Sequence, residues 1–327
     1  MKRLLPLIAL LIALGGCQEV QSVMSPGATG AAQIAQLAWL LFGLSAAIFL
    51  LVLAALWVAL RGPVRMRTHL ADSRAVVVGG IVFPTIVLTA LLGYSVWLLR
   101  GSIPHSSATG VVRIGVVGEQ WWWRVSYIRP GALPVASANE IRIPVGVEVE
   151  FTLNSADVIH SFWIPSLGGK VDMTPGRTTK LRVKAERVGI YRGQCAEYCG
   201  GPHAFMGISV LAMPSGEFIE WLQVESRGVT EATAEPSRSG QALFLAAGCG
   251  SCHAVRGTTA AGVLGPDLTR LGSRRSIAAE RLPMSRENLA RFITDGQHLK
   301  PGNRMPPFRI FSNAELETLT AYLASLR

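Results

Sequence analysis

Two long apolar runs limit what this chain can fold into. Residues 37–60 are continuously apolar and residues 75–99 nearly so, and each run is long enough to cross a hydrocarbon core of about 30 Å as a helix. Pro84 lies within the second run, where a proline is expected to kink the helix. Neither run contains His, Asp, Glu, Lys or Arg, the residues that a haem, copper or proton site inside a membrane requires. The runs predict a transmembrane helical hairpin over residues 37–100 that acts as an anchor and a docking surface.

The charges between the two runs indicate how this hairpin is oriented. The connecting segment contains one acidic residue, Asp72, and four arginines, Arg61, Arg65, Arg67 and Arg74. Basic loops stay in the cytoplasm, so both ends of the hairpin are expected on the outer face of the membrane. The chain has a formal net charge of +10 but no run of five basic residues. Nucleic acid is therefore not expected as a partner.

The N-terminus has the pattern of an export signal. Lys2 and Arg3 precede an apolar stretch, and small residues precede Cys17. Residues 1–16 are predicted to be a signal peptide. The pattern resembles a bacterial lipobox, which would make Cys17 the lipidated first residue of the mature protein; an uncleaved signal with an incidental cysteine is the alternative.

Residues 101–225 have the period-two pattern of an all-β domain. Short segments rich in β-branched residues are separated by Gly, Pro and Asn, which predicts a sandwich or barrel. The expected strands cover residues 111–117, 140–145, 147–153, 179–185 and 207–212. A short helix is expected over residues 216–224.

The remainder of the chain is predicted to be a linker and a small all-α domain. Residues 226–238 have no apolar periodicity and are expected to be the linker. Residues 239–327 are helical in character, and Ser312 with Glu315 matches a capping box that opens a final helix.

One short loop carries the donor atoms of a copper site. Cys195, Cys199, His203 and Met206 supply two thiolates, an imidazole and a thioether, and His160 lies upstream. Soft sulfur combined with imidazole suits copper. A structural zinc bound by His160, Cys195, Cys199 and His203 is the alternative, and it would leave the thioether without a role. The two thiolates can bridge a pair of copper ions.

A second motif lies in the C-terminal domain. Cys249, Cys252 and His253 form the CxxCH signature of covalent haem c, in which the two thiols bond to the haem and the histidine binds the iron. A thioredoxin-like CxxC is the alternative, but the following histidine and the helical surroundings disfavour it. Met305 is the expected second axial ligand, with Met284 and His298 as rivals.

These motifs resemble a known family. The segments GEQWWW at 118–123 and DVIHSFWIPSLGGKVDMTPG at 157–176, together with the copper loop, closely resemble subunit II of haem-copper cytochrome c oxidases over about residues 30–225. The motif NRMPPF at 303–308, with GPDL at 265–268, resembles class I cytochrome c, and this resemblance implies that the Pro266 carbonyl orients His253. The combination is similar to the fused subunit II of caa3-type oxidases. The implied fold is a transmembrane hairpin, a cupredoxin-like domain and a cytochrome c domain.

The resemblance also implies the roles of individual residues. It makes His160, Cys195, Cys199 and His203 the main ligands of a dinuclear CuA centre of two copper ions, with Met206 and the Glu197 backbone carbonyl as weak axial ligands. It makes the Glu197 side chain a ligand of a Mg or Mn ion at the contact with subunit I; a solvated carboxylate is the alternative. Trp121 would accept electrons from a cytochrome, while at least one of the three consecutive tryptophans is expected in the core or at a subunit interface. Glu119 stands where the family often has His.

The expected activity is electron transfer. By this resemblance electrons pass from an external cytochrome c, or from a quinol:cytochrome c reductase, through the tethered haem and CuA to subunit I, which reduces oxygen; subunit III is the further expected partner. The expected location is the bacterial inner membrane with both redox domains on the periplasmic face. A CuA subunit of a nitric oxide reductase and a zinc-stabilised non-redox module stay open as alternatives. A nitrous oxide reductase would need more than the six histidines present.

Overall fold

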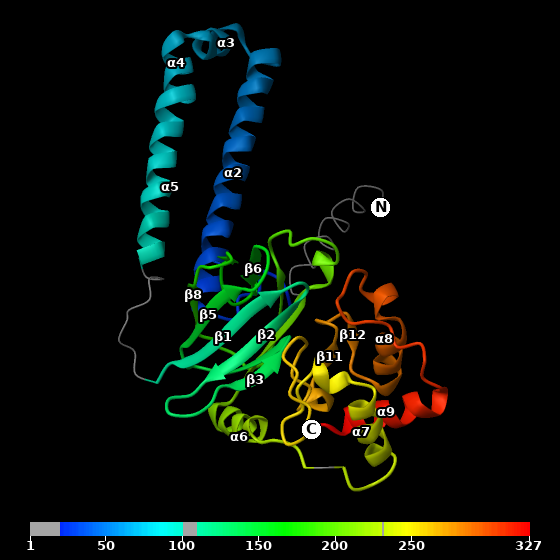
Figure 1. Ribbon diagram of the computed structural model, residues 1–327. Helices are drawn as coiled ribbons and strands as arrows, with labels where there is room; N and C mark the ends of the chain where they lie inside the picture. Colours follow the sequence, from blue (N-terminus) through cyan, green and yellow to red (C-terminus); the bar gives the residue numbers. More distant parts are fainter. Residues whose placement is uncertain (1–19, 101–109, 231) are drawn as a thin grey trace, which may run out of the picture. The chain divides into compact units, whose positions relative to one another are not determined.

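The computed structural model describes residues 20–100, 110–230 and 232–327 (Figure 1). The expected signal peptide and Cys17 lie outside these residues. The described residues form two compact units, one of residues 32–100 and the other of residues 20–31 with 110–327.

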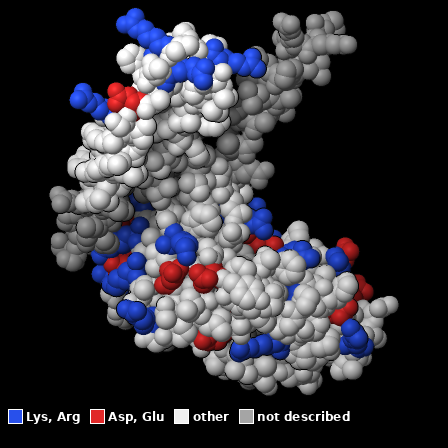
Figure 2. All heavy atoms as spheres, turned by 90° about the horizontal axis from the view of Figure 1, so that it is seen from above, with Lys and Arg blue, Asp and Glu red and all other residues white. Residues whose placement is uncertain are grey.

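The first unit is the expected helical hairpin. Two segments, Thr29–Arg61 and Ser73–Leu98, have hydropathies of 2.6 and 2.4 and are long and apolar enough to cross a membrane. Arginines gather over the segment that joins them (Figure 2). The helical elements are α2 (Thr29–Arg61), α3 (Val64–Ala71), α4 (Ser73–Val77), the π-helical turn η2 (Val78–Val82) and α5 (Phe83–Arg100).

The irregularity expected at Pro84 takes the form of a π-helical turn. The element η2 ends just before Phe83, whose backbone N–H donates to the Val78 carbonyl five residues earlier. A proline has no N–H to continue the ordinary helical pattern, and a π turn is one way to absorb the missing bond. Thr85 Oγ1 also donates to the Ile81 carbonyl at 2.7 Å.

The second unit contains the expected β domain, built from two five-stranded sheets. One sheet has the order β3-β2-β1-β5-β8 and the other β4-β10-β9-β6-β7. Strand β1 pairs antiparallel with β2 and parallel with β5. The strands are β1 (Val112–Glu119), β2 (Trp122–Ile128), β3 (Val135–Ala138), β4 (Glu140–Pro144), β5 (Val149–Ser155), β6 (His160–Trp163), β7 (Val171–Met173), β8 (Thr179–Val183), β9 (Gly189–Cys195) and β10 (Gly207–Met213).

Apolar side chains from both sheets fill the space between them. Burial alternates along β1 and β2, as expected for strands with one face on a core. Trp123, Phe151 and Phe162 are fully buried, and Trp123 packs edge-to-face on Phe162 at a centroid distance of 5.6 Å. Helix α6 (Ser215–Ser226) adds Phe218 to this core. The copper loop therefore starts and ends on strands whose inward-facing residues are packed into the core.

The C-terminal part is helical, as expected. Its core joins Phe244, Leu289, Ile293 and Tyr322 with other apolar residues. The predicted capping box is confirmed, since Ser312 and Glu315 bond each other's backbone at the start of the last helix. The elements are α7 (Ser237–Ala246), η4 (Cys249–Ser251), η5 (Leu271–Ser273), β11 (Ser276–Ile277), β12 (Leu282–Pro283), α8 (Arg286–Leu299) and α9 (Asn313–Ser325).

Candidate copper and haem sites

The loop between β9 and β10 brings the predicted copper ligands to one end of the second sheet. Cys195 is the last residue of β9, and Met206 directly precedes β10. His160 begins β6, which pairs antiparallel with β9 through Phe162 and Cys195. The register of two neighbouring strands thus joins His160 to a cysteine that is distant in sequence.

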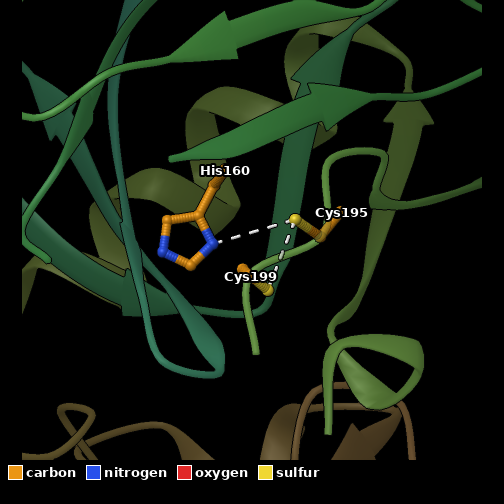
Figure 3. Close-up of side chains that lie close together, drawn as sticks. All are labelled: His160, Cys195 and Cys199. Atoms are coloured by element: carbon orange, nitrogen blue, oxygen red, sulfur yellow. Dashed lines mark hydrogen bonds between the residues drawn. The ribbon is translucent and has the colours of Figure 1, made fainter. Parts of the chain in front are cut away.

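Three of these side chains form a compact, buried donor cluster. Among the described residues, the donor atoms of His160, Cys195 and Cys199 all lie within 4.8 Å of one another (Figure 3). His160 Nδ1 is 3.7 Å from Cys195 Sγ, and the two sulfurs are 3.8 Å apart. All three residues are buried, so water is kept from the donors.

The remaining predicted ligands border this cluster. His203 Nδ1 lies 3.3 Å and Met206 Sδ 3.9 Å from Cys199 Sγ. The Glu197 carbonyl oxygen lies 3.2 Å from Cys195 Sγ. The two sulfurs therefore lie at the centre of the donor set, with one imidazole at each of them.

Asp157 fixes the orientation of the His160 ring. Its carboxylate lies 2.8 Å from His160 Nε2 and also accepts from the backbone N–H of Gln120 at 2.7 Å. Burial by itself lowers the pKa of His160, but its hydrogen bonds to Cys195 and Asp157 raise that pKa overall. With Nε2 engaged by the carboxylate, Nδ1 is the nitrogen presented to the sulfurs.

The two thiols hold unequal pKa values. The hydrogen bond with Cys199 lowers the pKa of Cys195, and the hydrogen bond with His160 acts in the same direction against burial. The contact between the sulfurs raises the pKa of Cys199, as burial also does. Cys195 is thus the thiol that ionises first, and a thiolate is the form that binds a soft metal.

Trp121 lies against the copper loop rather than free on the surface. Its indole Nε1 donates to the Cys199 carbonyl at 3.0 Å, and Gln120 Nε2 donates to the same oxygen at 2.8 Å. The side chain is half-buried, whereas Trp123 is fully buried in the core. This agrees with the expectation that at least one of the three tryptophans is a core residue.

The Glu197 side chain is partly exposed. It is 45% exposed, and its carboxylate lies 3.9 Å from Lys170 Nζ. Lys170 also pairs with Asp172 at 2.9 Å. An exposed carboxylate with a cationic neighbour fits a solvated loop residue and leaves its oxygens open to a cation supplied with further ligands from a partner.

The haem motif begins the second candidate site. Cys249 begins η4 and Cys252 follows it; both are free thiols and Cys252 is exposed. His253 Nδ1 lies 2.8 Å from the Pro266 carbonyl, the contact expected from the sequence. Burial lowers the pKa of His253, although the Pro266 bond opposes this. Nδ1 is thereby occupied, and Nε2 is left as the metal-binding nitrogen.

Met305 and its rival Met284 both pack against the core of the helical domain. The Met305 segment is held by side chains at both ends. Asn303 Oδ1 accepts from the Met305 backbone N–H at 3.0 Å, and Gln297 Nε2 donates to the Met305 carbonyl at 3.1 Å. Met305 thus lies in a defined loop that packs against the core of the helical domain. Its role as axial ligand stays a proposal.

Two glycines are required beside the candidate metal-binding histidines. A Cβ on Gly118 would lie 2.7 Å from His160 Cδ2, and one on Gly265 would lie 2.5 Å from His253 Cε1. Sequence reasoning gave neither glycine a role of its own, and it also missed Asp157 as the partner of His160. Both glycines and Asp157 fall inside motifs noted for the family resemblance, which was the one available signal.

The donor sets fit the groups that the sequence implies. Two buried sulfurs, flanked by two imidazoles and a thioether, are a soft set suited to copper. The thioether Met206 is fully buried among the donors, which a zinc site made of Cys and His alone does not need. Two free thiols followed by a histidine with one open nitrogen suit covalent haem c.

Taken together, the fold and the sites define a class of protein: an apolar helical hairpin followed by a β domain with a copper-type donor set and by a cytochrome c-type domain. Comparisons with known proteins place the chain more closely. Residues 128–213 match the family model of the periplasmic domain of cytochrome c oxidase subunit II, and residues 237–327 match that of cytochrome c. The chain belongs to the family of cytochrome c oxidase subunit II and carries a cytochrome c domain after it.

Relatives and solved structures carry the same description. Subunit 2 of cytochrome c oxidase from Alkalihalophilus pseudofirmus is 40% identical over 216 residues, which are 66% of this chain and 61% of the relative. The Bacillus subtilis subunit is 31% identical over 224 residues, covering 65% and 62%. The matched part thus spans about three fifths of these relatives. The crystal structure of the subunit II periplasmic domain from Bradyrhizobium japonicum is 31% identical, covering 37% of this chain and 96% of that domain, with a TM-score of 0.34.

These matches imply two cofactors and a location in coarse terms. The subunit II domain implies copper and the cytochrome c domain implies haem c. The two apolar helices and the match to a periplasmic domain support a membrane protein with its redox domains in the periplasm.

Proposed function

We propose that this chain is the electron-transfer subunit of a haem-copper terminal oxidase. It would take electrons from an external cytochrome c or a quinol:cytochrome c reductase and deliver them to subunit I, where oxygen is reduced to water. The observation that carries the proposal is the buried donor set of His160, Cys195 and Cys199, with His203 and Met206 beside it. When bound, a dinuclear copper centre and a covalent haem supply one-electron oxidation and reduction.

The residues of the chain would hold and insulate these groups. His160, Cys195, Cys199 and His203 are the proposed main copper ligands, with Met206 and the Glu197 carbonyl as weak ones. Buried ligands on packed strands resist displacement when the charge of a bound metal changes, which keeps the reorganisation energy low. Asp157 supports this by restraining the His160 ring.

Cys249 and Cys252 would bind the haem covalently, with His253 and Met305 as its axial ligands. Trp121 is the proposed electron-accepting residue, because its indole bonds directly to the loop carbonyl of Cys199. The Glu197 carboxylate is the proposed contribution of this chain to a Mg or Mn ion shared with subunit I; subunit III is a further proposed partner. Oxygen reduction is assigned to subunit I because the described helices of this chain contain no His, Asp, Glu, Lys or Arg within either apolar run.

The domain limits follow from the same proposal. We assign residues 1–16 to a signal peptide that leaves Cys17 lipidated, residues 37–100 to a multi-pass anchor in the bacterial inner membrane, residues 101–225 to the copper domain and residues 239–327 to the cytochrome domain. Residues 226–238 join the last two. In this segment the Val229 N–H donates to the Arg256 carbonyl at 2.7 Å, so the connection is bonded to the cytochrome domain.

Metal analysis of the purified full chain tests the proposal. After expression with copper supply and haem maturation, two copper ions and one covalent haem per chain are expected, together with the near-infrared absorption of a mixed-valence copper pair. Zinc at the Cys195 and Cys199 site with no copper would instead support a non-redox module.

A further inference from the structure

A buried lysine joins the cytochrome domain to the copper domain. Lys300, at the end of α8, is 3% exposed. Its ammonium group donates to the carbonyls of Trp121 at 2.6 Å, Phe205 at 2.8 Å and Ala278 at 3.0 Å. Lysine is almost never this buried unless it is paired, and the acceptors found in the described part of the chain are backbone carbonyls from three separate segments.

The three acceptors lie at functionally distinct places. Trp121 is the proposed electron-accepting residue, and Phe205 directly precedes the candidate ligand Met206. Ala278 belongs to the turn between β11 and β12 of the cytochrome domain. Burial lowers the pKa of Lys300 to about 7. Removing this ammonium group from water costs solvation free energy, and its three hydrogen bonds compensate for that cost. The junction therefore depends on these hydrogen bonds.

Residues that follow Lys300 cover the indole of Trp121. A Cβ on Gly201 of the copper loop would lie 3.2 Å from Trp121 Cζ2, and one on Gly302 would lie 3.5 Å from its Cη2. The six-membered ring therefore lies between the copper loop and the turn after Lys300. Arg304 extends this contact, because its guanidinium lies 3.8 Å from the carboxylate of Asp157, the partner of His160.

A strained turn completes the junction. Ala278, Ala279 and Glu280 have φ values of 55°, 59° and 65°, a left-handed conformation that is costly for residues with a side chain. The Ala279 carbonyl accepts from the Gly207 N–H at 3.1 Å, and Glu280 pairs with Arg192 at 3.0 Å and bonds Ser209. Such strain persists only where surrounding contacts fix the backbone, and these contacts belong to β9 and β10.

We propose that Lys300 is a latch that holds segment 300–304 of the cytochrome domain over Trp121, so that the tethered domain, and no separate protein, reaches this indole. An external donor would accordingly dock on the cytochrome domain. The inference rests on the proposed function for its electron-transfer consequence, whereas the latch itself is a property of the polypeptide. Lys300 is a positioning residue, since it acts through the Trp121 backbone.

Hydrogen exchange of the full chain in detergent tests the latch directly. Lys300→Met keeps the length of the side chain and removes its three hydrogen bonds. If the junction opens, the Gly207 amide should exchange at least ten times faster than in the unchanged chain. Lys184→Met is the matched control, because Lys184 is exposed on the β domain, and it should leave this exchange rate unchanged.

Electron transfer provides the second readout. After rapid reduction of the haem in the loaded chain, its electron transfer to the copper centre should slow at least tenfold in Lys300→Met, with both absorption spectra unchanged. Unchanged Gly207 exchange in Lys300→Met would overturn the latch, whatever the rate does. If the chain binds neither copper nor haem, the proposed function fails, and the exchange measurement still decides the latch.

A second variant guards against misfolding of the first. Arg192→Gln removes the exposed partner of Glu280 at the same junction. The arginine side chain is 52% exposed, so this substitution does not disturb the core. It should accelerate Gly207 exchange severalfold while leaving the fold intact. No acceleration in this variant, combined with a misfolded Lys300→Met, would also overturn the proposal.

Discussion

The copper site depends on residues that do not themselves supply a donor atom to the metal. Asp157 holds His160 Nε2 at 2.8 Å, and Gly118 leaves room for the imidazole ring, since a Cβ there would clash with it. The ligand side chains are therefore placed by the strands that carry them and by these two neighbours. Substitutions of the ligands and substitutions of these neighbours should therefore affect copper binding in different ways.

Replacing Asp157 by Asn should weaken copper binding without removing a ligand. The amide oxygen can still accept from His160 Nε2, but the negative charge that orients and polarises the imidazole is lost. We expect a loss of about 10- to 100-fold in copper affinity, measured by competition with a chelator. Asp295→Asn, in the cytochrome domain, is the control. An unchanged affinity would mean that backbone packing alone orients the ring.

Replacing Met206 by Leu separates a weak ligand from a principal one. Leucine fills a similar volume in this fully buried position and removes the sulfur that lies 3.9 Å from Cys199 Sγ. The copper should stay bound, and its reduction potential should shift, because axial thioethers tune copper sites. Potentiometric titration of the near-infrared band checks this. Complete loss of copper would show Met206 to be a principal ligand.

At the scale of elements, the strands and helices follow patterns that are mostly local. The five strands expected from period-two patterns appear as β1, β4, β5, β8 and β10, with limits within about two residues. Strands β2, β3, β6, β7 and β9 were not among the expected ranges. Three of them have only three or four residues, too short for a period to be detected, and β9 is interrupted by glycine. These strands form because neighbouring strands in the sheet supply their hydrogen-bond partners.

The ion pairs between β5 and β8 should make the free energy of unfolding depend on pH in the acid range. Glu150 is buried, and hydrogen bonds from Lys180 and Arg182 lower its pKa from the ordinary 4.5, although burial opposes this. A lowered folded pKa means that the contribution is fully present above pH 4.5 and is lost as the pH falls through the folded pKa.

Glu150→Gln should remove this acid-dependent contribution. We expect unfolding at neutral pH to become easier by about 1–3 kcal/mol, and the stability profile below pH 4.5 to become flatter. Thermal unfolding of the full chain across this pH range measures both. Glu148→Gln, which removes a more exposed partner of Arg182, should have a smaller effect; equal effects in the two variants would contradict this assignment.

At the scale of the molecule, one arginine joins three distant stretches of chain. Arg270 is 8% exposed and donates to the carbonyls of Val224 at 2.8 Å and Arg227 at 3.2 Å, and also to the carbonyl of the C-terminal Arg327. The guanidinium thus donates hydrogen bonds to the end of α6, to the start of the connecting segment and to the end of the cytochrome domain. A forked cation suits this arrangement better than a single ammonium group does.

Arg270→Lys should therefore loosen the attachment of the cytochrome domain to the connecting segment. One ammonium group cannot reach all three carbonyls, so we expect a loss of about 1–3 kcal/mol in unfolding free energy, seen by calorimetry of the full chain. The exposed Arg227→Lys change, which leaves the Arg227 carbonyl in place, should have little effect. Equal loss in both variants would contradict a specific role for the Arg270 guanidinium.

Features that lie within short stretches of chain could be predicted before the fold was known. The apolar runs, the capping box, the copper loop and the CxxCH motif each fall within one segment, so residue type and spacing were enough to predict them. Local chemistry also indicated copper over zinc, through the thioether of Met206.

The folded structure was needed to show which distant residues meet. The pairing of Asp157 with His160, the clearance at Gly118 and Gly265, and the bonds of Lys300 to Trp121 and Phe205 depend on strand register and on the contact between two domains. A lysine at the end of a helix has no local pattern that distinguishes a solvated side chain from a buried one. Its role follows from long-range packing, which sequence spacing does not encode.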